Sequence, residues 1–495
     1  MFEQLPALQV AITLTAAPLV MLLWKAPRLA WAITLASCWA SLAVTLALFG
    51  AVADGGSWSY EMGGWAPPWG IEYRVDAANA WILLIIGLVS AIVMPYARES
   101  VEREIAREKI ALFYSAFLLA NAGLIGIAIT GDAFNIFVFF EISALASYAL
   151  IAMGSDRRAV LSAYQYLVMG TVGTTFLLIG IGFLYIMTGT LNLYDLAARL
   201  PEVSDTNTVR AAFAFLVVGI SLKLALFPLH LWLPNAYSYA PSMVTVFLSA
   251  TATKVAIYVL LRFIYSVFGF EFSFEELSMQ WVLMPLALLG IVIPSVAAVF
   301  QDDVKRLLAY SSVAQVGYMI LGISLASALG LMASILHLFN HAITKAALFM
   351  AVGCLVYRLG GVSLRRIAGA GQRMPWTMAA FVIAGLSLIG VPLTAGFVTK
   401  WHLLQATLEA GYWPVALLLL GSSLLAAMYI WKVVEAAYFR EPEDAGADVR
   451  EAPLALLVPT WALTLATLVF GIWAAFSVGA ARTAAEVLLG RGVAW

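Results

Sequence analysis

Long apolar runs follow one another along the whole chain, and short polar stretches separate them. A helix needs about 20 mostly apolar residues to cross the hydrocarbon core of a bilayer, and fourteen runs come close to that length. The predicted spans are 5–24, 29–53, 79–96, 110–130, 132–153, 161–188, 210–235, 241–268, 278–300, 307–325, 327–358, 375–408, 413–440 and 453–480. The runs are continuous rather than alternating, which excludes a membrane β-barrel. The pattern therefore predicts an all-α polytopic membrane protein with about 14 transmembrane helices.

The composition supports this fold class and excludes several others. Hydrophobic residues make up 63% of the 495-residue chain, compared with ~45–50% in soluble globular proteins. Charged residues make up only 11%, too few to cover the surface of a soluble protein of this length. The net charge of −1 provides no basic surface, so nucleic acid is not expected as a partner. The expected surroundings are the lipid bilayer of the cell membrane.

Charges in the connections predict how the chain is oriented in the membrane. Glu3 stands where a signal peptide would carry basic residues, so the first run is interpreted as a retained span with its N-terminus outside. An even number of spans then places the C-terminus outside as well. In this arrangement the inside connections carry 16 Lys and Arg residues and the outside connections carry 5, as the positive-inside rule requires. We therefore expect 97–109 and 358–374 inside, and 54–78 and 189–209 outside.

Several ionisable residues lie deep within the predicted spans. An unpaired charge at the centre of a bilayer costs about 3 kcal/mol on insertion scales, so each such residue is a candidate for function. Glu141 follows roughly ten residues of its span, which corresponds to about 15 Å or half the hydrocarbon thickness. The candidate residues are Glu141, Lys223, Lys254, His337, His341, Lys345 and Lys400. By contrast, Arg262 and Lys432 lie near enough to span ends for their charged groups to reach the interface.

The candidate residues favour proton transfer over other chemistry. Burial and a neighbouring carboxylate act in opposite directions on the proton affinity of a lysine, and histidine titrates near neutrality. His337 and His341 have the spacing of a metal-binding helix face, but no acidic residue or cysteine stands near them in sequence to complete a site. No metal or cofactor is predicted, because phosphate-loop, dinucleotide and haem motifs are absent. His230 and His402 are interpreted as polar lining residues that can also take part in proton movement.

Two spans contain helix breakers close to a deep lysine. Pro228 follows Lys223, and Gly390 with Pro392 precedes Lys400. Membranes tolerate such breaks where the freed backbone groups line a cavity. If spans 4–8 and 9–13 form two inverted five-helix repeats, the breaks fall in the fourth member of each, spans 7 and 12. The predicted division is 1–109 for helices 1–3, 110–268 and 278–440 for the two repeats, and 441–495 for helix 14 and the tail.

Five segments resemble the proton-translocating antiporter-like family, which comprises subunits of respiratory complex I, membrane-bound hydrogenases and Mrp-type cation/proton antiporters. The segments are Gly131–Glu141, Thr188–Asn192, Lys223–Pro234, Ala309–Tyr318 and His337–Phe349. The first two segments are most similar to the D subunit of Mrp-type Na⁺/H⁺ antiporters. The resemblance implies that Glu141 and Lys223 pair in a first half-channel, that Lys254 links toward the centre, and that Lys400 ends the second half-channel.

The resemblance also implies partners and a function. We expect the chain to be a transporter subunit rather than an enzyme, conducting protons within a multisubunit Na⁺/H⁺ antiporter and assembling with its other membrane subunits. Two alternatives remain open at this point. The seven candidate residues, taken together as a proton wire, also suit an ion-pumping subunit of complex I or a membrane-bound hydrogenase. A structural scaffold is a further alternative, but it does not explain two broken helices that each carry a deep lysine.

Overall fold

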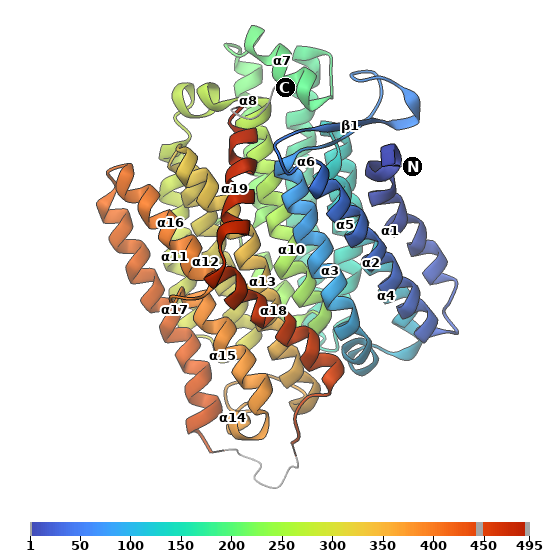
Figure 1. Ribbon diagram of the computed structural model, residues 1–495, viewed down its shortest axis with the longest axis vertical. Coiled ribbons are helices and arrows are strands. Elements are labelled where there is room, and N and C mark those ends of the chain that lie inside the picture. The colour runs from blue at the N-terminus through green and yellow to red at the C-terminus, as the bar shows by residue number, and fades with distance from the viewer. Residues whose placement is uncertain (1, 442–448, 491–495) are drawn as a thin grey trace.

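The computed structural model describes residues 2–441 and 449–490 and forms one tall bundle of helices (Figure 1). About 80% of the chain is helical. Among the described residues, 12 helices are long and apolar enough to cross a membrane, and Leu5–Met21 and Pro375–Ile389 are shorter apolar helices. Each of the fourteen predicted spans corresponds to one of these helices, so the predicted fold class is confirmed.

The first part of the bundle holds four long helices and a small hairpin. The helices are α1 (Leu5–Met21), α2 (Pro27–Ala51), α3 (Ala77–Glu104) and α4 (Ile110–Ile129), with short 3₁₀ turns at Phe2–Gln4, Met62–Gly64 and Arg107–Lys109. The antiparallel strands β1 (Trp58–Glu61) and β2 (Glu72–Val75) pair Trp58 with Val75. Asp76 starts α3 by accepting hydrogen bonds from the backbone N–H groups of Ala78 and Asn79.

The central part contains the first broken span. Its helices are α5 (Ala133–Ala152), α6 (Arg158–Thr188), α7 (Leu193–Arg199), α8 (Asn207–Leu224), α9 (Trp232–Tyr239) and α10 (Ser242–Leu261). A 3₁₀ turn at Leu200–Glu202 and two π-helical turns, η5 (Arg262–Val267) and η6 (Glu271–Glu276), complete it. Helix α8 ends where Ala225 adopts a φ of 59°, and α9 resumes the span after Pro228. The predicted interruption of span 7 is therefore present.

The last part contains the second broken span. Its helices are α11 (Gln280–Val299), α12 (Val304–Ser324), α13 (Ala328–Leu359), α14 (Ala370–Arg373), α15 (Pro375–Ile389), α16 (Ala395–Glu409), α17 (Trp413–Phe439), α18 (Leu454–Ile472) and α19 (Ala475–Leu488). Helix α15 ends where Gly390 adopts a φ of 91°, and α16 continues the span. Span 14, predicted as 453–480, is made of two helices, because the chain leaves helical geometry at Trp473.

Matching features support the predicted repeats. Asp132 caps the start of α5 and forms a backbone bridge with Asn192, which follows α6. Asp303 caps the start of α12 and forms the same kind of bridge with Ser363, which follows α13. The first bridge lies near α7 and the second near α14, at opposite ends of the bundle (Figure 1). This inverted correspondence supports the two repeats, whose exact division stays a proposal.

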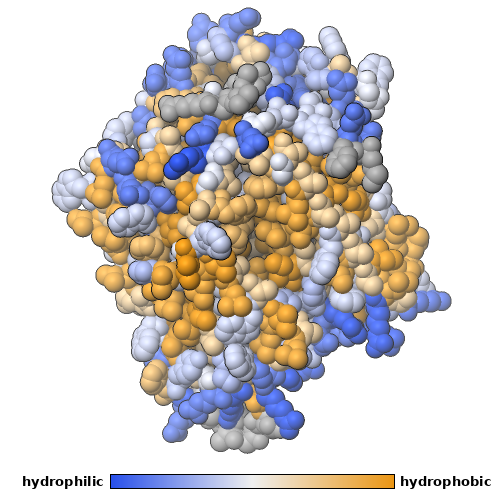
Figure 2. All heavy atoms as spheres, in the orientation of Figure 1, coloured by the Kyte–Doolittle hydropathy of each residue, from blue (hydrophilic) through white to orange (hydrophobic). Residues whose placement is uncertain are grey.

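The bundle has two polar ends and an apolar middle. Hydrophilic residues gather at both ends of the face shown in Figure 2, and hydrophobic residues form the broad zone between them. We call the end that carries α7 and β1 the α7 face, and the end that carries α14 the α14 face (Figure 1). The start of α1 and the end of α19 both lie toward the α7 face, as an even number of spans requires. Which face lies inside the cell stays a prediction.

Candidate functional site

The predicted site residues come from five helices, α5, α8, α10, α13 and α16. Five of the seven side chains are buried among the described residues, namely Lys223, Lys254, His337, His341 and Lys345. Glu141 and Lys400 are partly exposed on the isolated chain. Five of the seven residues that the sequence places at mid-membrane depth are therefore buried in the bundle.

Lys223 lies in the last turn of α8, immediately before the first break. Its Nζ is buried and has no hydrogen-bond partner among the described residues. The nearest aromatic ring is that of Phe140, whose centroid is 5.8 Å from Nζ. The neighbouring Glu141 is close enough to act on Lys223 electrostatically, but the two do not form an ion pair within the part of the chain that the structure describes. Lys223 is thus a cation without a direct counter-ion.

Lys254 and Lys345 form the centre of the site. Lys254 donates to the backbone oxygen of Ser249 on its own helix. Lys345 Nζ donates to the backbone oxygen of Leu308 at 2.8 Å and to the hydroxyl of Ser311, both on α12. Each ammonium group therefore has neutral oxygen partners. The two lysines also act on each other electrostatically, so protonation of one disfavours protonation of the other.

Two histidines extend the site along α13. The rings of His337 and His341 are stacked, with centroids 5.5 Å apart and planes inclined by 17°. His337 Nε2 forms a hydrogen bond of 2.8 Å with Gln315 Oε1, whereas both ring nitrogens of His341 lack partners among the described residues. The two imidazole rings therefore lie next to each other on one face of α13. Within the described residues, no group of three or more His, Cys, Asp and Glu side chains is arranged to hold a metal ion.

Lys400 connects the two halves of the second broken span. Its Nζ donates to the backbone oxygen of Ile389 at 2.7 Å and to Ser423 Oγ at 2.9 Å. Ile389 is the last residue of α15, so a cation stands at the carboxyl end of that helix, where it is favoured. The Nζ also lies 5.1 Å from the ring centroid of Tyr318, and that ring lies 5.9 Å from His337. Tyr318 therefore stands between Lys400 and the histidines.

The structure corrects the interpretation of Arg262. The sequence suggested that this side chain reaches the membrane interface, but Arg262 is only 3% exposed and its Nη2 lies 2.7 Å from Asp76 Oδ2. Arg262 also donates to the hydroxyl of Tyr258 at 3.2 Å. Burial is possible because the carboxylate neutralises the guanidinium. Lys432 does reach the α14 face, where it donates to backbone oxygens at the end of α11.

Sequence reasoning missed three polar residues that hold the site together. Gln315, Tyr318 and Ser311 all lie on α12, within or next to the segment that carries the family resemblance. They were not singled out because an uncharged polar side chain in a span costs far less than a charge. A helical wheel of α12 could have found them, since positions 311, 315 and 318 share one face. His230 is buried, and its Nδ1 has no hydrogen-bond partner among the described residues.

Known proteins are similar to this chain in both sequence and fold. Residues 130–426 match the family described as NADH:quinone oxidoreductase/Mrp antiporter, TM. The N subunit of NADH-quinone oxidoreductase from Desulforudis audaxviator is 41% identical over 440 residues, which cover 86% of this chain and 87% of the relative. The D subunit of the Na⁺/H⁺ antiporter from Bacillus subtilis is 29% identical over 428 residues, which cover 86% and 85%.

Solved structures of several membrane complexes resemble the whole chain. A chain of the Mrp complex from Dietzia sp. has a TM-score of 0.90 at 28% identity, and the match covers 99% of this chain and 97% of the other. A chain of an archaeal membrane-bound sulfane sulfur reductase has a TM-score of 0.89 at 31% identity, covering 98% of each. A chain of respiratory complex I from Thermus thermophilus has a TM-score of 0.77 at 25% identity, covering 95% and 98%.

Proposed function

The chain belongs to the NADH:quinone oxidoreductase/Mrp antiporter transmembrane family, and we propose that it conducts protons along a line of buried side chains at mid-membrane depth. It is a multi-pass membrane subunit of the antiporter type. Its structural neighbours are chains of multisubunit membrane complexes. We propose further that it serves a multisubunit Na⁺/H⁺ antiporter in the cell membrane, where its partners are the other membrane subunits.

One observation supports the wire above the others: the residues from Lys400 to Lys254 and Lys345 neighbour one another across the second helix break. Lys400 joins the end of α15 to α17 and lies beside Tyr318, which in turn lies beside His337. His337 stacks on His341, and His341 lies within electrostatic range of Lys254 and Lys345. A proton that arrives at one group repels the charge on the next, so the groups titrate as a coupled set.

The chemistry of conduction requires only transfers between nitrogen and oxygen. In the proposed sequence, a lysine Nζ gives a proton to a neighbouring water, hydroxyl or imidazole nitrogen and receives another from its opposite side. Glu141 influences Lys223 by charge alone, because no ion pair joins them in this conformation. The negative charge of Glu141 therefore stabilises the ammonium form of Lys223.

A second function has a specific observation in its favour. The relative named as the N subunit of NADH-quinone oxidoreductase is 41% identical, whereas two relatives named as D subunits of Na⁺/H⁺ antiporters are 29% and 30% identical. This second function is that of an ion-pumping subunit of a redox complex, in which electron transfer in other subunits would drive the same proton wire. The family membership and the site are shared by both functions, so the difference lies in the partners.

Purification of the intact complex from its native membrane separates the two functions. Small hydrophobic antiporter subunits in the complex would support the antiporter, whereas flavin- or iron–sulfur-containing subunits would support the redox complex. Proton flux is then measured in inverted vesicles after addition of NaCl in the first case, or of an electron donor in the second. Absence of proton flux under both conditions would contradict the proposed conduction itself.

A further inference from the structure

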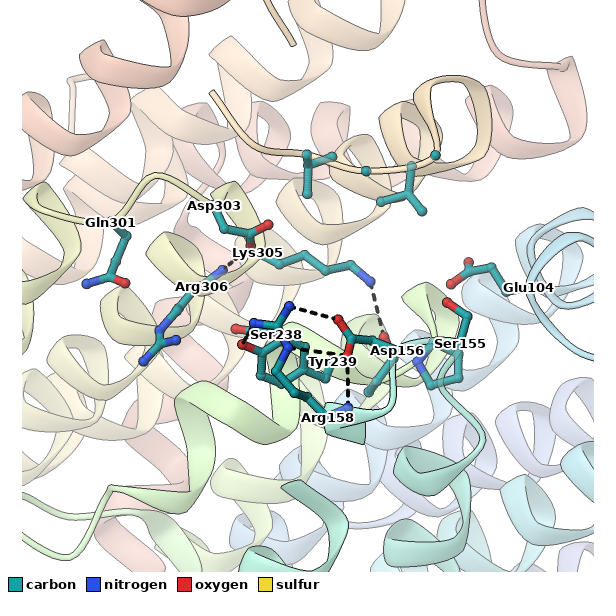
Figure 3. A pocket seen from close by; sticks show the side chains of 16 residues that line it. Glu104, Ser155, Asp156, Arg158, Ser238, Tyr239, Gln301, Asp303, Lys305 and Arg306 are labelled. Carbon is teal, nitrogen blue, oxygen red and sulfur yellow. Dashed lines mark hydrogen bonds and ion pairs between the residues drawn. The ribbon is translucent and has the colours of Figure 1, made fainter. Parts of the chain in front are cut away.

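A polar cavity of about 520 Å³ opens at the α14 face, apart from the mid-membrane residues (Figure 3). Three acidic and three basic residues line it, drawn from α3, the α5–α6 turn and the start of α12. They are Glu104, Asp156, Arg158, Asp303, Lys305 and Arg306. A cavity of this size holds many water molecules, since one water takes up about 30 Å³ of liquid volume. The cavity is therefore large enough to admit water to this end of the bundle.

Lys305 is the least exposed of the three basic residues that line this cavity. It is the second residue of α12 and is only 7% exposed, and its side chain extends across the cavity toward Glu104 (Figure 3). Its Nζ donates to the backbone oxygen of Ala240 at 3.1 Å, next to the start of α10. Glu104 and Asp303 act on Lys305 electrostatically, and no ion pair of Lys305 is present among the described residues.

Local contacts hold three of the other charged groups of the cavity, Asp156, Arg158 and Asp303. A hydrogen bond from the Arg158 backbone, with the guanidinium beside it, keeps the pKa of Asp156 below its usual range. Arg158 also donates to the hydroxyl of Tyr239 at 3.0 Å. Burial raises the pKa of Asp303, although the backbone N–H of Arg306 partly offsets the effect. Lys305 is thus a buried amine in the lining of a charged cavity.

The position of Lys305 on α12 connects the cavity to the central lysines. Leu308 lies three residues further along the same helix, a rise of about 4.5 Å. Its backbone oxygen accepts hydrogen bonds from both Lys345 Nζ at 2.8 Å and the hydroxyl of Ser312 at 3.0 Å. The hydroxyl of Ser311, which also accepts from Lys345, lies less than one turn beyond. Leu308 O and the hydroxyl of Ser311 therefore stand beside Lys345 Nζ, within a helical rise of about 9 Å from Lys305 along α12.

We infer that this cavity is the aqueous access path of the α14 face, and that Lys305 passes protons between the cavity and Lys345. The inference rests on the proposed proton conduction. In the transfer, the Nζ of Lys305 gives a proton to water or a serine hydroxyl of α12, that oxygen gives one to Lys345, and cavity water returns a proton to Lys305. Only N–H and O–H bonds form and break, so no further reactant is required.

Substitutions of Lys305 in the full complex test the inference. Lys305→Met and Lys305→Arg should both lower proton flux on the order of tenfold or more, a loss typical of removing a proton-transfer group. Arginine keeps the positive charge and the hydrogen bond to Ala240, but its guanidinium stays protonated. Lys432→Met is the matched control, since Lys432 also donates to backbone oxygens at this face but does not line the cavity. It should retain flux.

The outcomes separate this inference from the proposed function. Normal flux in Lys305→Arg with lost flux in Lys305→Met would overturn it, because Lys305 would then be a fixed charge that holds α9 to α12. Normal flux in both variants, with none in Lys223→Ala, would overturn the access path and leave conduction intact. Normal flux in all three would instead contradict conduction.

A second measurement does not depend on replacing Lys305. Ser155→Cys places a thiol at the cavity lining, and a positively charged, membrane-impermeant thiol reagent should fill the cavity and inhibit flux. The native cysteines, Cys38 and Cys354, are buried and should not react. Glu108→Cys, in the 3₁₀ turn after α3, is the control on the same face outside the cavity. Undiminished flux after complete labelling of Ser155→Cys would contradict the access path.

Discussion

At the scale of single residues, Lys223 is the buried lysine whose ammonium group has no hydrogen-bond partner among the described residues. Lys223→Ala therefore removes no bond that holds the fold, and we expect it to abolish ion exchange while assembly stays largely intact. Glu141→Ala should give the same phenotype, because the carboxylate acts on Lys223 electrostatically. Proton uptake into inverted vesicles measures exchange, and native gels measure assembly. Near-normal uptake in both variants would refute the assignment of the wire.

Lys400 allows a sharper test, because three substitutions separate charge from proton transfer. Lys400→Ala should remove exchange. Lys400→Arg should also fail, since guanidinium can keep the bond to Ile389 but cannot release a proton. Lys400→Glu places a negative charge at the carboxyl end of α15, which is unfavourable, and should disrupt exchange or shift its pH profile. Exchange is measured across pH values from about 7 to 9.5, a range that spans lysine titration when burial opposes the charge.

Parental activity of Lys400→Arg would show that Lys400 is a fixed charge. The proton path would then end near His341 and Lys345. In that case the contact of Lys400 with Ile389 would serve only to join the two halves of the broken span.

The cost of burying charge explains how much of the site the sequence predicts. Each of the seven predicted residues carries a titratable group in a span, and five of them are buried in the bundle. The ion pair of Asp76 with Arg262 escaped prediction, because its members are 186 residues apart and Asp76 lies in a polar connection. Uncharged partners such as Gln315 escaped as well, since they carry little cost of burial.

At the scale of helices, Gly390 fixes how α15 ends. Its φ of +91° is a conformation that favours glycine, and a Cβ there would meet Lys400 Cδ at 2.7 Å. Gly390→Ala should therefore displace Lys400 and lower exchange severalfold. Gly411→Ala is the matched control, because Gly411 has a φ of +79° but has nothing within 4 Å of such a Cβ. Both variants are compared for exchange and thermal stability in detergent.

Equal exchange in the two glycine variants would show that backbone strain alone accounts for the effect. That strain is about 1–2 kcal/mol per residue in the left-handed region. A selective loss in Gly390→Ala would instead show that the break positions the lysine.

The helix breaks also show how far the fold follows from sequence. Pro228 and Pro392 predicted that spans 7 and 12 are interrupted, since proline removes a backbone hydrogen bond. The place where α8 ends was not predictable, because Ala225 rather than glycine takes the positive φ there. The second helix of span 14 was missed because the apolar run continues past Trp473. Apolar length thus predicts which segments cross the membrane, whereas tertiary packing decides where each helix stops.

At the scale of the whole molecule, the polar connections divide between two faces. The connections 54–78 and 189–209 lie at the α7 face with β1 and α7, whereas 358–374 lies at the α14 face (Figure 1). Glu104 and Gly360 line one cavity, so 97–109 reaches the α14 face as well. The structure thereby confirms which connections share a face. Because the α14-face connections carry most of the Lys and Arg residues, we predict that this face lies inside the cell.

Single cysteines in these four connections test the orientation. Cells are treated with a membrane-impermeant thiol reagent before and after the membrane is opened, in a chain whose buried Cys38 and Cys354 provide the background. Cysteines placed in 54–78 and 189–209 should react in intact cells, and those placed in 97–109 and 358–374 only after opening. Labelling of 358–374 from outside would reverse the orientation. The cavity beside Lys305 would then face the exterior, and the direction of proton access through it would be reversed as well.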